Sequence, residues 1–348
     1  MNKPEKIKNG IGAKVLIIYT GGTLGMVYNE RTKNLVPFAF SQIVENVPEL
    51  SRLQQELHYV AFDVPIDSAN IIPEDWIKIV EIITDTYENY NGFVILHGTD
   101  TMAYTASALS FMVQNLKKPI ILTGAQLPIG IPRTDAKENL ITAIEIAGNK
   151  EITLPEVCIY FNGRLLRGNR AKKRESSQFD AFDSENLPYL AEIGVSMDYN
   201  VDLILKANAE KSTQFYTHLQ SNIAVIRLFP GLRVDFIRQI IEVSKPAGIV
   251  IESYGAGNAP SEEDFWTVFK SAIDNKILVL NVSQCTGGHV DMGKYETSQK
   301  LKEIGVLSGH DMTIEAAICK LMWVCALPLG YEEQKIKLET NIAGELTM

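Results

Sequence analysis

Metal ligands and disulfide partners are scarce in this chain. Its 348 residues include four cysteines and five histidines. The cysteines lack the paired spacing of a zinc site, and the scattered histidines form no His-Glu-x-x-His run or comparable ligand set. Three of the cysteines lie in strongly apolar segments, where a free thiol behaves as a small hydrophobe. We therefore expect reduced, structural cysteines and no metal site.

The chain also lacks a basic excess, a secretory leader and a long apolar run. Its formal net charge is -9, whereas nucleic acids and anionic membranes attract proteins through a basic field. Residues 1–14 are polar with four lysines, and no window approaches 18 uninterrupted apolar residues. We expect a cytoplasmic protein that acts on a small molecule and has no nucleic-acid or membrane partner.

Hydrophobic residues make up 46% of the chain and gather in short apolar runs separated by helical patterns. Such runs are typical of parallel strands that are covered on both faces. In the first half they predict strands at 14–19, 93–96, 119–123 and 157–161, and helices at about 101–115 and 135–147. A strand, a turn, a helix and a second strand make a βαβ unit, so this half predicts a mainly parallel sheet.

The same alternation resumes after an irregular stretch at 197–221. It predicts strands at 223–229, 248–254 and 277–282, and helices at about 234–243, 262–273 and 313–326. The expected fold class is α/β with two α/β domains, as the length of the chain allows. We place a larger N-terminal domain with a mainly parallel sheet at 1–196, a linker at 197–221, and a smaller C-terminal α/β domain at 222–348.

Two short runs place threonine hydroxyls at the ends of predicted strands. The first, TGGT at Thr20–Thr23, directly follows the apolar stretch Val15–Tyr19. The second, HGTDT at His97–Thr101, directly follows Phe93–Leu96. Open α/β sheets bind their ligands at the carboxyl ends of the strands, so both runs stand where chemistry is expected.

A threonine hydroxyl is a weak nucleophile until a base or a hydrogen-bond network takes its proton. Thr23 and Thr99, together with the carboxylate of Asp100, therefore suggest a hydrolase that uses threonine as its nucleophile. For the TGGT run by itself the alternative is an ordinary strand-to-loop turn, because its two glycines also permit a tight turn.

The HGTDT run has two interpretations. Asp100 could bind a substrate ammonium while Thr99 presents its hydroxyl to the reacting carbonyl, with His97 orienting the loop. Alternatively, Asp100 belongs only to a helix cap, for which Thr101 is a natural capping residue. Asp135 is placed in the same way to cap the helix at 135–147.

Six basic residues fall within eleven positions, from Arg164 to Arg174. Most of them should form a solvated face. A lysine buried beside Thr99 would differ, because desolvation favours the neutral amine, which can accept a proton. Spacing alone leaves Lys172 and Lys173 as alternatives.

Two further runs carry weaker signals. Asp67–Asn70 follows an apolar run and precedes a helix start at Pro73, so its hydroxyl and amides could hold a carboxylate, although a capped turn is the alternative. Gly255–Pro260 matches a dinucleotide fingerprint only briefly and has proline at the last glycine position. We expect no nicotinamide cofactor, and a tight loop that presents Asn258.

Together these motifs resemble the bacterial L-asparaginases of the cytoplasmic type I branch. The likeness extends over nearly the whole chain, and its most specific match is the run GFVILHGTDTMAYTASALSFM at 92–112. Further matches are Arg167–Arg170, Phe179–Phe182, Ser253–Gly255 with Gly257–Pro260, and Gly344–Thr347. The resemblance implies an amidohydrolase that converts L-asparagine and water to L-aspartate and ammonia without a cofactor.

The resemblance also implies roles for the catalytic residues. Thr23 matches the primary nucleophile of the family. Thr99, Lys173 and Asp100 match a second, triad-like group. Backbone amides beside either threonine are plausible donors to the oxyanion that forms when an amide carbon is attacked.

Substrate binding follows from the same resemblance. Asp67 and Ser68 match the family's substrate-binding segment, in which Ser68 is expected to take the α-carboxylate and Asp100 the α-ammonium. Family active sites are completed across a subunit contact, and the loop that holds Asn258 is the candidate for it here. A homodimer or homotetramer is therefore implied.

Two positions depart from the family pattern. The family usually has a tyrosine in the loop after Thr23, but the best-matching position here is Leu35. Tyr28, earlier in the same loop, is the possible substitute. Some type I relatives bind asparagine at a regulatory site through an arginine whose position is held here by Glu252, so we do not expect that form of cooperativity.

Two alternatives to an asparaginase follow from these observations. One is a catalytically silent amino-acid sensor that retains the fold. The other is an asparaginase-like subunit that releases ammonia for a tRNA-dependent amidotransferase. That second role would favour an appended domain and a basic RNA-facing surface, neither of which the sequence shows.

Overall fold

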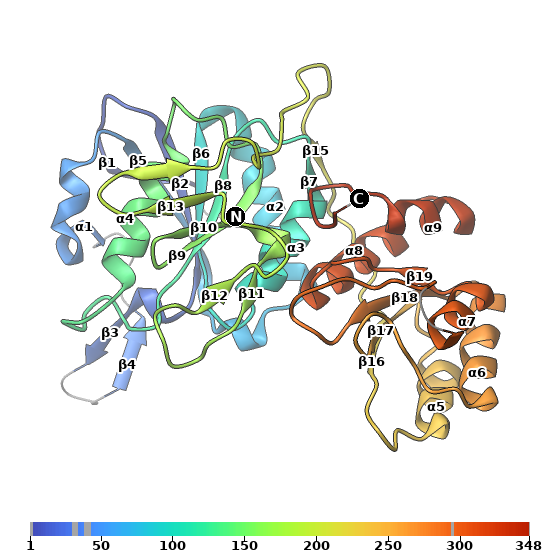
Figure 1. The fold of residues 1–348 in the computed structure, drawn as a ribbon. Coiled ribbons are helices and arrows are strands. Elements are labelled where there is room, and N and C mark those ends of the chain that lie inside the picture. The colour runs from blue at the N-terminus through green and yellow to red at the C-terminus, as the bar shows by residue number, and fades with distance from the viewer. Residues whose placement is uncertain (1–2, 30–33, 38–42, 294–295, 348) are drawn as a thin grey trace. The chain divides into compact units, whose positions relative to one another are not determined.

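The computed structural model describes residues 3–29, 34–37, 43–293 and 296–347, drawn in Figure 1. The chain separates into two compact units. Unit 1 consists of Met1–Ser184 with Pro188–Thr217, and unit 2 of Glu185–Leu187 with His218–Met348. Each unit has its own sheet and its own helices.

The main sheet of unit 1 has five parallel strands in its middle and antiparallel strands at both ends. Within the described residues the strands follow one another across the sheet as β1 (Glu5–Lys8), β5 (Glu56–Ile66), β2 (Lys14–Gly21), β6 (Gly92–Leu96), β8 (Ile120–Thr123), β9 (Val157–Phe161), β10 (Arg164–Arg167), β13 (Ala191–Ile193) and β14 (Met197–Tyr199). The parallel strands are the ones that periodicity predicts, together with β5.

The parallel strands β5, β6, β8 and β9 are connected in turn by α2 (Pro73–Thr86), α3 (Met102–Met112) and α4 (Ala136–Ala147). In α2 the buried side chains recur at Trp76, Ile79, Val80 and Ile83, which is one stripe of an amphipathic helix. In α3 every residue except Tyr104 is buried. A helix that is apolar on all sides belongs in the interior, and α3 accordingly anchors the loop that precedes it.

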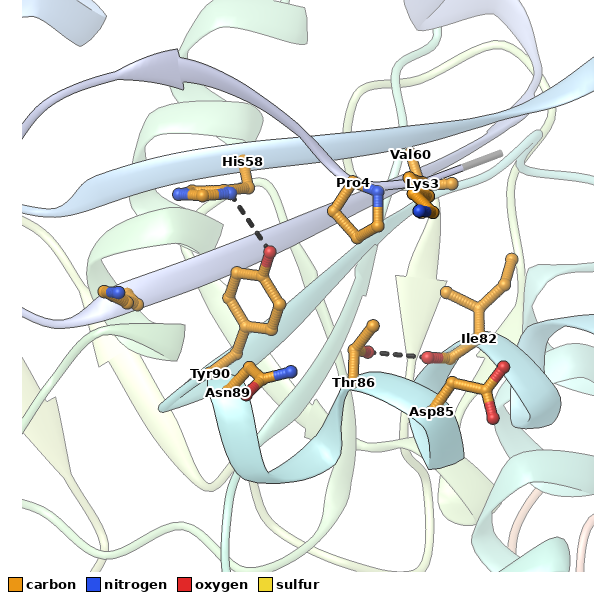
Figure 2. A pocket seen from close by; sticks show the side chains of 10 residues that line it. Lys3, Pro4, His58, Val60, Ile82, Asp85, Thr86, Asn89 and Tyr90 are labelled. Carbon is orange, nitrogen blue, oxygen red and sulfur yellow. Dashed lines mark hydrogen bonds between the residues drawn. The ribbon is translucent and has the colours of Figure 1, made fainter. Parts of the chain in front are cut away.

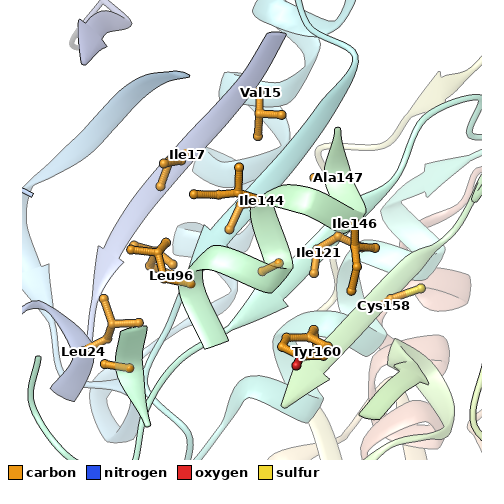
Figure 3. Close-up of a cluster of buried hydrophobic side chains, with 14 of the residues drawn as sticks. Val15, Ile17, Leu24, Leu96, Ile121, Ile144, Ile146, Ala147, Cys158 and Tyr160 are labelled. Atoms are coloured by element: carbon orange, nitrogen blue, oxygen red, sulfur yellow. The ribbon is translucent and has the colours of Figure 1, made fainter. Parts of the chain in front are cut away.

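The core of unit 1 packs alternate residues of the parallel strands against α4. Side chains two apart on a strand point to the same face, so each strand contributes every second residue. Figure 3 shows this cluster, with Cys158 as one of its members, as expected of a thiol that packs as a small hydrophobe. Its labelled residues are Val15, Ile17, Leu24, Leu96, Ile121, Ile144, Ile146, Ala147, Cys158 and Tyr160.

Short elements complete unit 1. They are the antiparallel pairs β3 (Met26–Asn29) with β4 (Asn34–Pro37), β7 (Val113–Gln114) with β15 (Gln214–Phe215), and β11 (Lys172–Lys173) with β12 (Phe182–Asp183), and the helix α1 (Ile43–Asn46). The segment 197–221, predicted as a linker, contains β14 and β15, both paired with strands of unit 1.

Unit 2 is a smaller α/β unit with a four-stranded parallel sheet in the described residues. Its strands lie in the order β16 (Ile223–Arg227), β17 (Gly248–Ser253), β18 (Leu278–Ser283) and β19 (Leu307–Ser308). Its helices are α5 (Val234–Ser244), α6 (Glu263–Asp274), α7 (Glu296–Ile304), α8 (Ile314–Ala326) and α9 (Tyr331–Glu339). The sequence analysis did not predict β19, α7 and α9, because the strand is short and both helices have few apolar residues to reveal a period.

A fully buried ion pair holds the C-terminal segment of unit 2. Lys320 on α8 and Glu345 are both 0% exposed, and Lys320 Nζ lies 2.6 Å from Glu345 Oε1. Lys320 Nζ also donates to the carbonyl of Thr340 at 2.7 Å. The Glu345 carboxylate accepts the backbone N–H groups of Ile342 and Ala343. Burial lowers the pKa of Lys320, and Glu345 opposes that shift.

Two expected helix caps are wrong. Thr101 and Asp135 occupy the N-cap positions of α3 and α4, but neither side chain caps its helix. The hydroxyl of Thr101 donates to the carbonyl of Ser68 at 2.7 Å. The carboxylate of Asp135 accepts the backbone N–H groups of Gln126 and Leu127. Both groups tie loops of the carboxyl edge together, which outweighs capping here.

The predicted fold class is confirmed: two α/β units, the larger one N-terminal with a mainly parallel sheet. None of the helices in the described ranges combines the length and apolarity that crossing a bilayer requires.

Candidate active site

Three neighbouring strands of unit 1 deliver the candidate residues to one edge of the sheet. β5, β2 and β6 are adjacent and parallel. Asp67 follows directly after β5, Thr23 follows shortly after β2, and Thr99 follows shortly after β6. Because parallel strands end at the same edge, all three loops lie at the carboxyl edge, where sheets of this class bind ligands.

Two glycines allow these loops to approach each other closely. Gly22 has φ +85°, and a Cβ there would lie 2.5 Å from the backbone nitrogen of Gly98. A Cβ on Gly98 would in turn lie 2.4 Å from Ser68 Oγ. Larger residues would have to displace backbone at Gly22. The residues that follow the two glycines, Thr23 and Thr99, therefore stand on loops in direct contact.

Lys173 joins Thr99 and Asp100 from far along the chain. Its Nζ donates to Thr99 Oγ1 at 2.8 Å and lies 2.6 Å from Asp100 Oδ1. The side chain of Lys173 is 16% exposed and that of Asp100 is 64% exposed. Lys173 and Asp100 form an ion pair, in which the lysine is a charged ammonium. The sequence analysis considered a neutral amine at this position. As an ammonium, Lys173 must first release a proton before it can accept one from a hydroxyl.

The structure distinguishes between the two lysines. Lys172 and Lys173 are consecutive residues of β11, and consecutive side chains of a strand point to opposite faces. Lys173 is the one that reaches Thr99. An ion pair next to β11 also links the two strands of this short sheet, since Arg174 Nη1 lies 2.6 Å from Asp183 Oδ2 on β12.

Thr23 begins a short 3-10 turn, Thr23–Gly25, directly after Gly22. A side chain of β2 stabilises this turn, since Tyr19 Oη donates to the carbonyl of Gly25 at 3.3 Å. Burial raises the pKa of Tyr19 to about 12, so the phenol keeps the proton that it donates. The Thr23 hydroxyl itself makes no hydrogen bond to another described residue.

His97 holds the loop that precedes Thr99 through a directed chain of hydrogen bonds. Trp76 Nε1 can only donate, and it donates to Thr105 Oγ1 at 2.9 Å. The carbonyl of Gly98 can only accept, so His97 Nδ1 donates to it at 2.7 Å, and in the neutral ring Nε2 then accepts the hydroxyl of Thr105 at 2.9 Å. Burial lowers the pKa of His97 to about 4, so the ring is neutral and this tautomer persists.

The expected substrate-binding segment is connected to the same loop. Asp67 Oδ1 accepts the backbone N–H of Ala69 at 3.1 Å, which caps the 3-10 turn Ser68–Asn70. Ser68 is 4% exposed and its carbonyl accepts the hydroxyl of Thr101. Residues 67–70 therefore form the capped turn that was one of the two alternatives, and the same turn also contacts the loop that carries Thr99.

Sequence analysis missed one residue that touches the site. Gln126 Oε1 accepts the hydroxyl of Thr99 at 3.2 Å. Gln126 follows β8, the strand next to β6 in the sheet. The same rule that singled out the loops after β2 and β6 could have found it, because β8 ends at the same edge.

Two of the predicted residues, Asn258 and Tyr28, are not among the side chains that the structure describes at the carboxyl edge of unit 1. Asn258 belongs to unit 2, where its backbone N–H donates to the carbonyl of Tyr254 in a tight loop after β17. Unit 1 by itself therefore does not contain Asn258. Tyr28 pairs with Leu35 in the backbone register of β3 and β4, and both side chains lie outside the described part.

A separate pocket of about 570 Å³ lies at the other end of the same strands (Figure 2). Lys14, the first residue of β2, is one of its lining residues. In this pocket Tyr90 Oη lies 3.1 Å from His58 Nδ1, and His58 Nε2 lies 2.9 Å from Glu56 Oε1. The pocket stands at the amino ends of the strands and is distinct from the carboxyl-edge site.

Both halves of the chain match models of the asparaginase family. Residues 14–205 match the family model described as "Asparaginase, N-terminal", and residues 222–337 match the "Glutaminase/Asparaginase C-terminal domain". The chain belongs to the asparaginase family. The resemblance seen in the sequence motifs is thereby confirmed.

Within this family the chain is similar to "L-asparaginase 1" of Escherichia coli strain K12. The two are 39% identical over 334 residues, which cover 96% of this chain and 98% of the relative. The crystal structure of L-asparaginase I from Vibrio cholerae superposes with a TM-score of 0.89 at 36% identity, covering 97% of this chain and 100% of that one. The thermostable L-asparaginase from Thermococcus kodakarensis gives 0.89 at 33% identity, with coverage of 96% and 99%.

Proposed function

We propose that this protein hydrolyses the side-chain amide of L-asparagine to give L-aspartate and ammonia. The observation that carries this proposal is the contact of Lys173 Nζ with Thr99 Oγ1 at 2.8 Å, on a loop that touches the one carrying Thr23. Amide hydrolysis needs an activated oxygen nucleophile and a proton for the departing ammonia. Similarity to named L-asparaginases over nearly the full length supports this substrate.

Thr23 is the proposed nucleophile. Its oxygen attacks the amide carbon while its proton passes to a base. The amide nitrogen of the tetrahedral intermediate takes up that proton and leaves as ammonia. Water then attacks the resulting ester and restores the hydroxyl. The place of Thr23 directly after Gly22, on a loop in contact with the loop that carries Thr99, supports this role.

Thr99, Lys173 and Asp100 form the proposed second group. The α-ammonium of asparagine would bind Asp100, whose exposed carboxylate now pairs with Lys173. A second cation at this carboxylate weakens the existing ion pair and favours loss of a proton from Lys173. Substrate binding would thus release the neutral amine that Thr99 needs as its base.

The remaining assignments are part of the same proposal. Asp67 and Ser68 would bind the α-carboxylate of the substrate. Asn258 would complete the site from a second copy of the chain in a homodimer or homotetramer, and Tyr28 would serve the loop after Thr23. We place the protein in the cytoplasm, acting without a cofactor or metal and without a nucleic-acid or membrane partner.

The alternatives are weaker. A silent sensor has no need of a lysine in contact with the Thr99 hydroxyl, whereas the proposed proton transfer requires such a contact. An ammonia-releasing amidotransferase subunit is less well supported than an asparaginase, because the relatives described above match over nearly all of both chains and are named asparaginases.

Ammonia release with L-asparagine, L-glutamine and D-asparagine tests the proposal. We expect rapid turnover of L-asparagine, and loss of about 10²- to 10⁴-fold in kcat for Thr23→Ala and for Thr99→Ala with unchanged Tm. Thr84→Ala, on the solvent side of α2, is the matched control and should retain full activity. Tight binding of asparagine by the native protein without any turnover would favour the sensor.

A further inference from the structure

We propose that Gln126 is a positioning residue that sets the direction of the Thr99 hydroxyl. The proposal rests on the proposed function and adds a residue to it. It is based on one contact at the site, Gln126 Oε1 with Thr99 Oγ1 at 3.2 Å, and on the groups that hold Gln126.

The orientation of the Gln126 amide follows from its second contact. Its Nε2 donates to the backbone carbonyl of Gln178 at 2.9 Å. A carbonyl oxygen can only accept, so the NH₂ group must face Gln178. The amide oxygen then faces Thr99, and at that position Gln126 acts as an acceptor.

The backbone of Gln126 is held independently of its side chain. Its N–H donates to both carboxylate oxygens of Asp135, at 2.9 and 3.1 Å, and Leu127 N–H donates to Oδ1 at 3.0 Å. Asn139 Nδ2 donates to Asp135 Oδ2 at 3.2 Å and to the carbonyl of Gly124 at 3.0 Å. Gln126 is thereby fixed to the start of α4, so its amide presents a stationary acceptor.

The protons around Thr99 can be assigned from these contacts. Lys173 in its ammonium form has only donors, so it donates to Thr99 Oγ1. The single hydroxyl proton of Thr99 therefore goes to Gln126 Oε1. In the ligand-free state this proton points away from Lys173. The Thr99 hydroxyl can rotate its proton towards Lys173 only after the lysine has lost a proton. Until then the hydrogen bond to Gln126 Oε1 fixes the direction of the O–H group.

Gln126→Met tests the positioning role, because methionine keeps the length of the side chain and removes both hydrogen bonds. We expect kcat for asparagine to fall about 3- to 10-fold, the range for one hydrogen bond, with KM changed less than twofold. The matched control is Gln114→Met, since Gln114 also donates its amide to a backbone carbonyl, that of Phe111, away from the site. A kcat for Gln126→Met equal to that of the control would overturn the proposal.

Gln126→Glu provides a readout that a purely structural role would not move. The glutamate still accepts from Thr99 but adds a negative charge beside Lys173, which stabilises the ammonium form. The rising limb of the pH dependence of kcat should therefore move to higher pH than in the native protein. An unshifted limb in a folded Gln126→Glu variant would contradict the proposed position of this residue.

Hydrogen exchange separates this proposal from the proposed function. Gln126→Met leaves the Gln178 carbonyl without its side-chain donor, so the amides of residues 174–181 should exchange faster, whether or not the protein turns over asparagine. If the native protein does not hydrolyse asparagine but exchange in this segment rises, the proposed function fails, whereas the contact with Gln178 that orients the Gln126 amide towards Thr99 stands. Unchanged exchange would contradict that contact and with it the proposed orientation of the amide.

Discussion

Lys173 Nζ lies 2.8 Å from Thr99 Oγ1, although the two residues are 74 positions apart in the chain. The contact joins the short strand β11 to the loop after β6. It requires the whole βαβ succession between them to fold, and so the candidate site exists only in the native state of unit 1.

Replacing Lys173 should be far more damaging than replacing its neighbour. Lys173→Met removes the group that touches both Thr99 and Asp100, so kcat for asparagine should fall by about 10²- to 10⁴-fold, as for loss of a general base. Lys172→Met, on the opposite face of β11, should stay within a few-fold of the native rate. Steady-state kinetics on both variants decide this, and the reverse order of effects would show that the wrong lysine has been assigned.

A side chain at Gly22 should separate the two threonine loops. Gly22 has φ +85°, and a Cβ would lie 2.5 Å from the backbone nitrogen of Gly98. Gly22→Ala is therefore expected to lower Tm and to reduce activity at least tenfold, through both strain and displacement of Thr23. Gly194→Ala is the control, because no atom lies within 4 Å of the Cβ position there. Native activity in Gly22→Ala would argue against the close contact of the loops.

His97 should make the protein less stable in acid. Burial lowers its pKa from 6.5 to about 4, so between these values the unfolded chain binds a proton that the folded chain does not. Stability should thus decrease as the pH falls from about 6.5 towards 4, by roughly 3 kcal/mol in total.

Urea unfolding at pH 7 and pH 4.5 measures this effect. The native protein should lose more unfolding free energy between the two conditions than His97→Gln, which cannot titrate in this range. The variant should also be less stable at pH 7, because it disturbs the hydrogen-bond chain from Trp76 to Gly98. Equal pH dependence in both proteins would show that another group dominates.

The buried ion pair of unit 2 should be sensitive to loss of one partner only. Lys320→Met leaves the Glu345 carboxylate buried without its cation, which should cost about 3 to 5 kcal/mol. The double variant Lys320→Met with Glu345→Gln should recover part of this loss, because no buried charge remains. Chemical denaturation of the native protein, of Lys320→Met, of Glu345→Gln and of the double variant measures the coupling, and additive losses in the double variant would rule out the expected compensation.

Much of the framework is predictable from local sequence. The strands predicted at 14–19, 93–96 and 157–161 correspond to β2, β6 and β9. These predictions succeed because a strand that is buried on both faces needs a continuous apolar run, which other elements of this length do not require. The helices α7 and α9 escape the same method, since their exposed, charged sequences leave too few apolar residues to define a period.

The capping residues show where local reasoning fails. Thr101 and Asp135 have the side chains and positions of helix caps, but each bonds to a loop outside its own helix, 33 residues away for Thr101 and nine residues away for Asp135. A hydroxyl or a carboxylate satisfies whichever donor or acceptor the tertiary fold brings to it, and short-range preference amounts to only about 1 kcal/mol.

The amino-acid sequence alone determined which residues could stand at the carboxyl edge of a parallel sheet, because strand direction and the position of each run follow from local patterns. It therefore pointed to Thr23, Thr99 and Asp100. Spacing along the chain left Lys172 and Lys173 as alternatives, and the family resemblance pointed to Lys173. Only the tertiary structure shows that Lys173 Nζ lies 2.8 Å from Thr99 Oγ1 and that Gln126 accepts the Thr99 hydroxyl. Hydrogen bonds act over about 3 Å, a distance that depends on how separate strands and loops pack and that no spacing along the chain encodes.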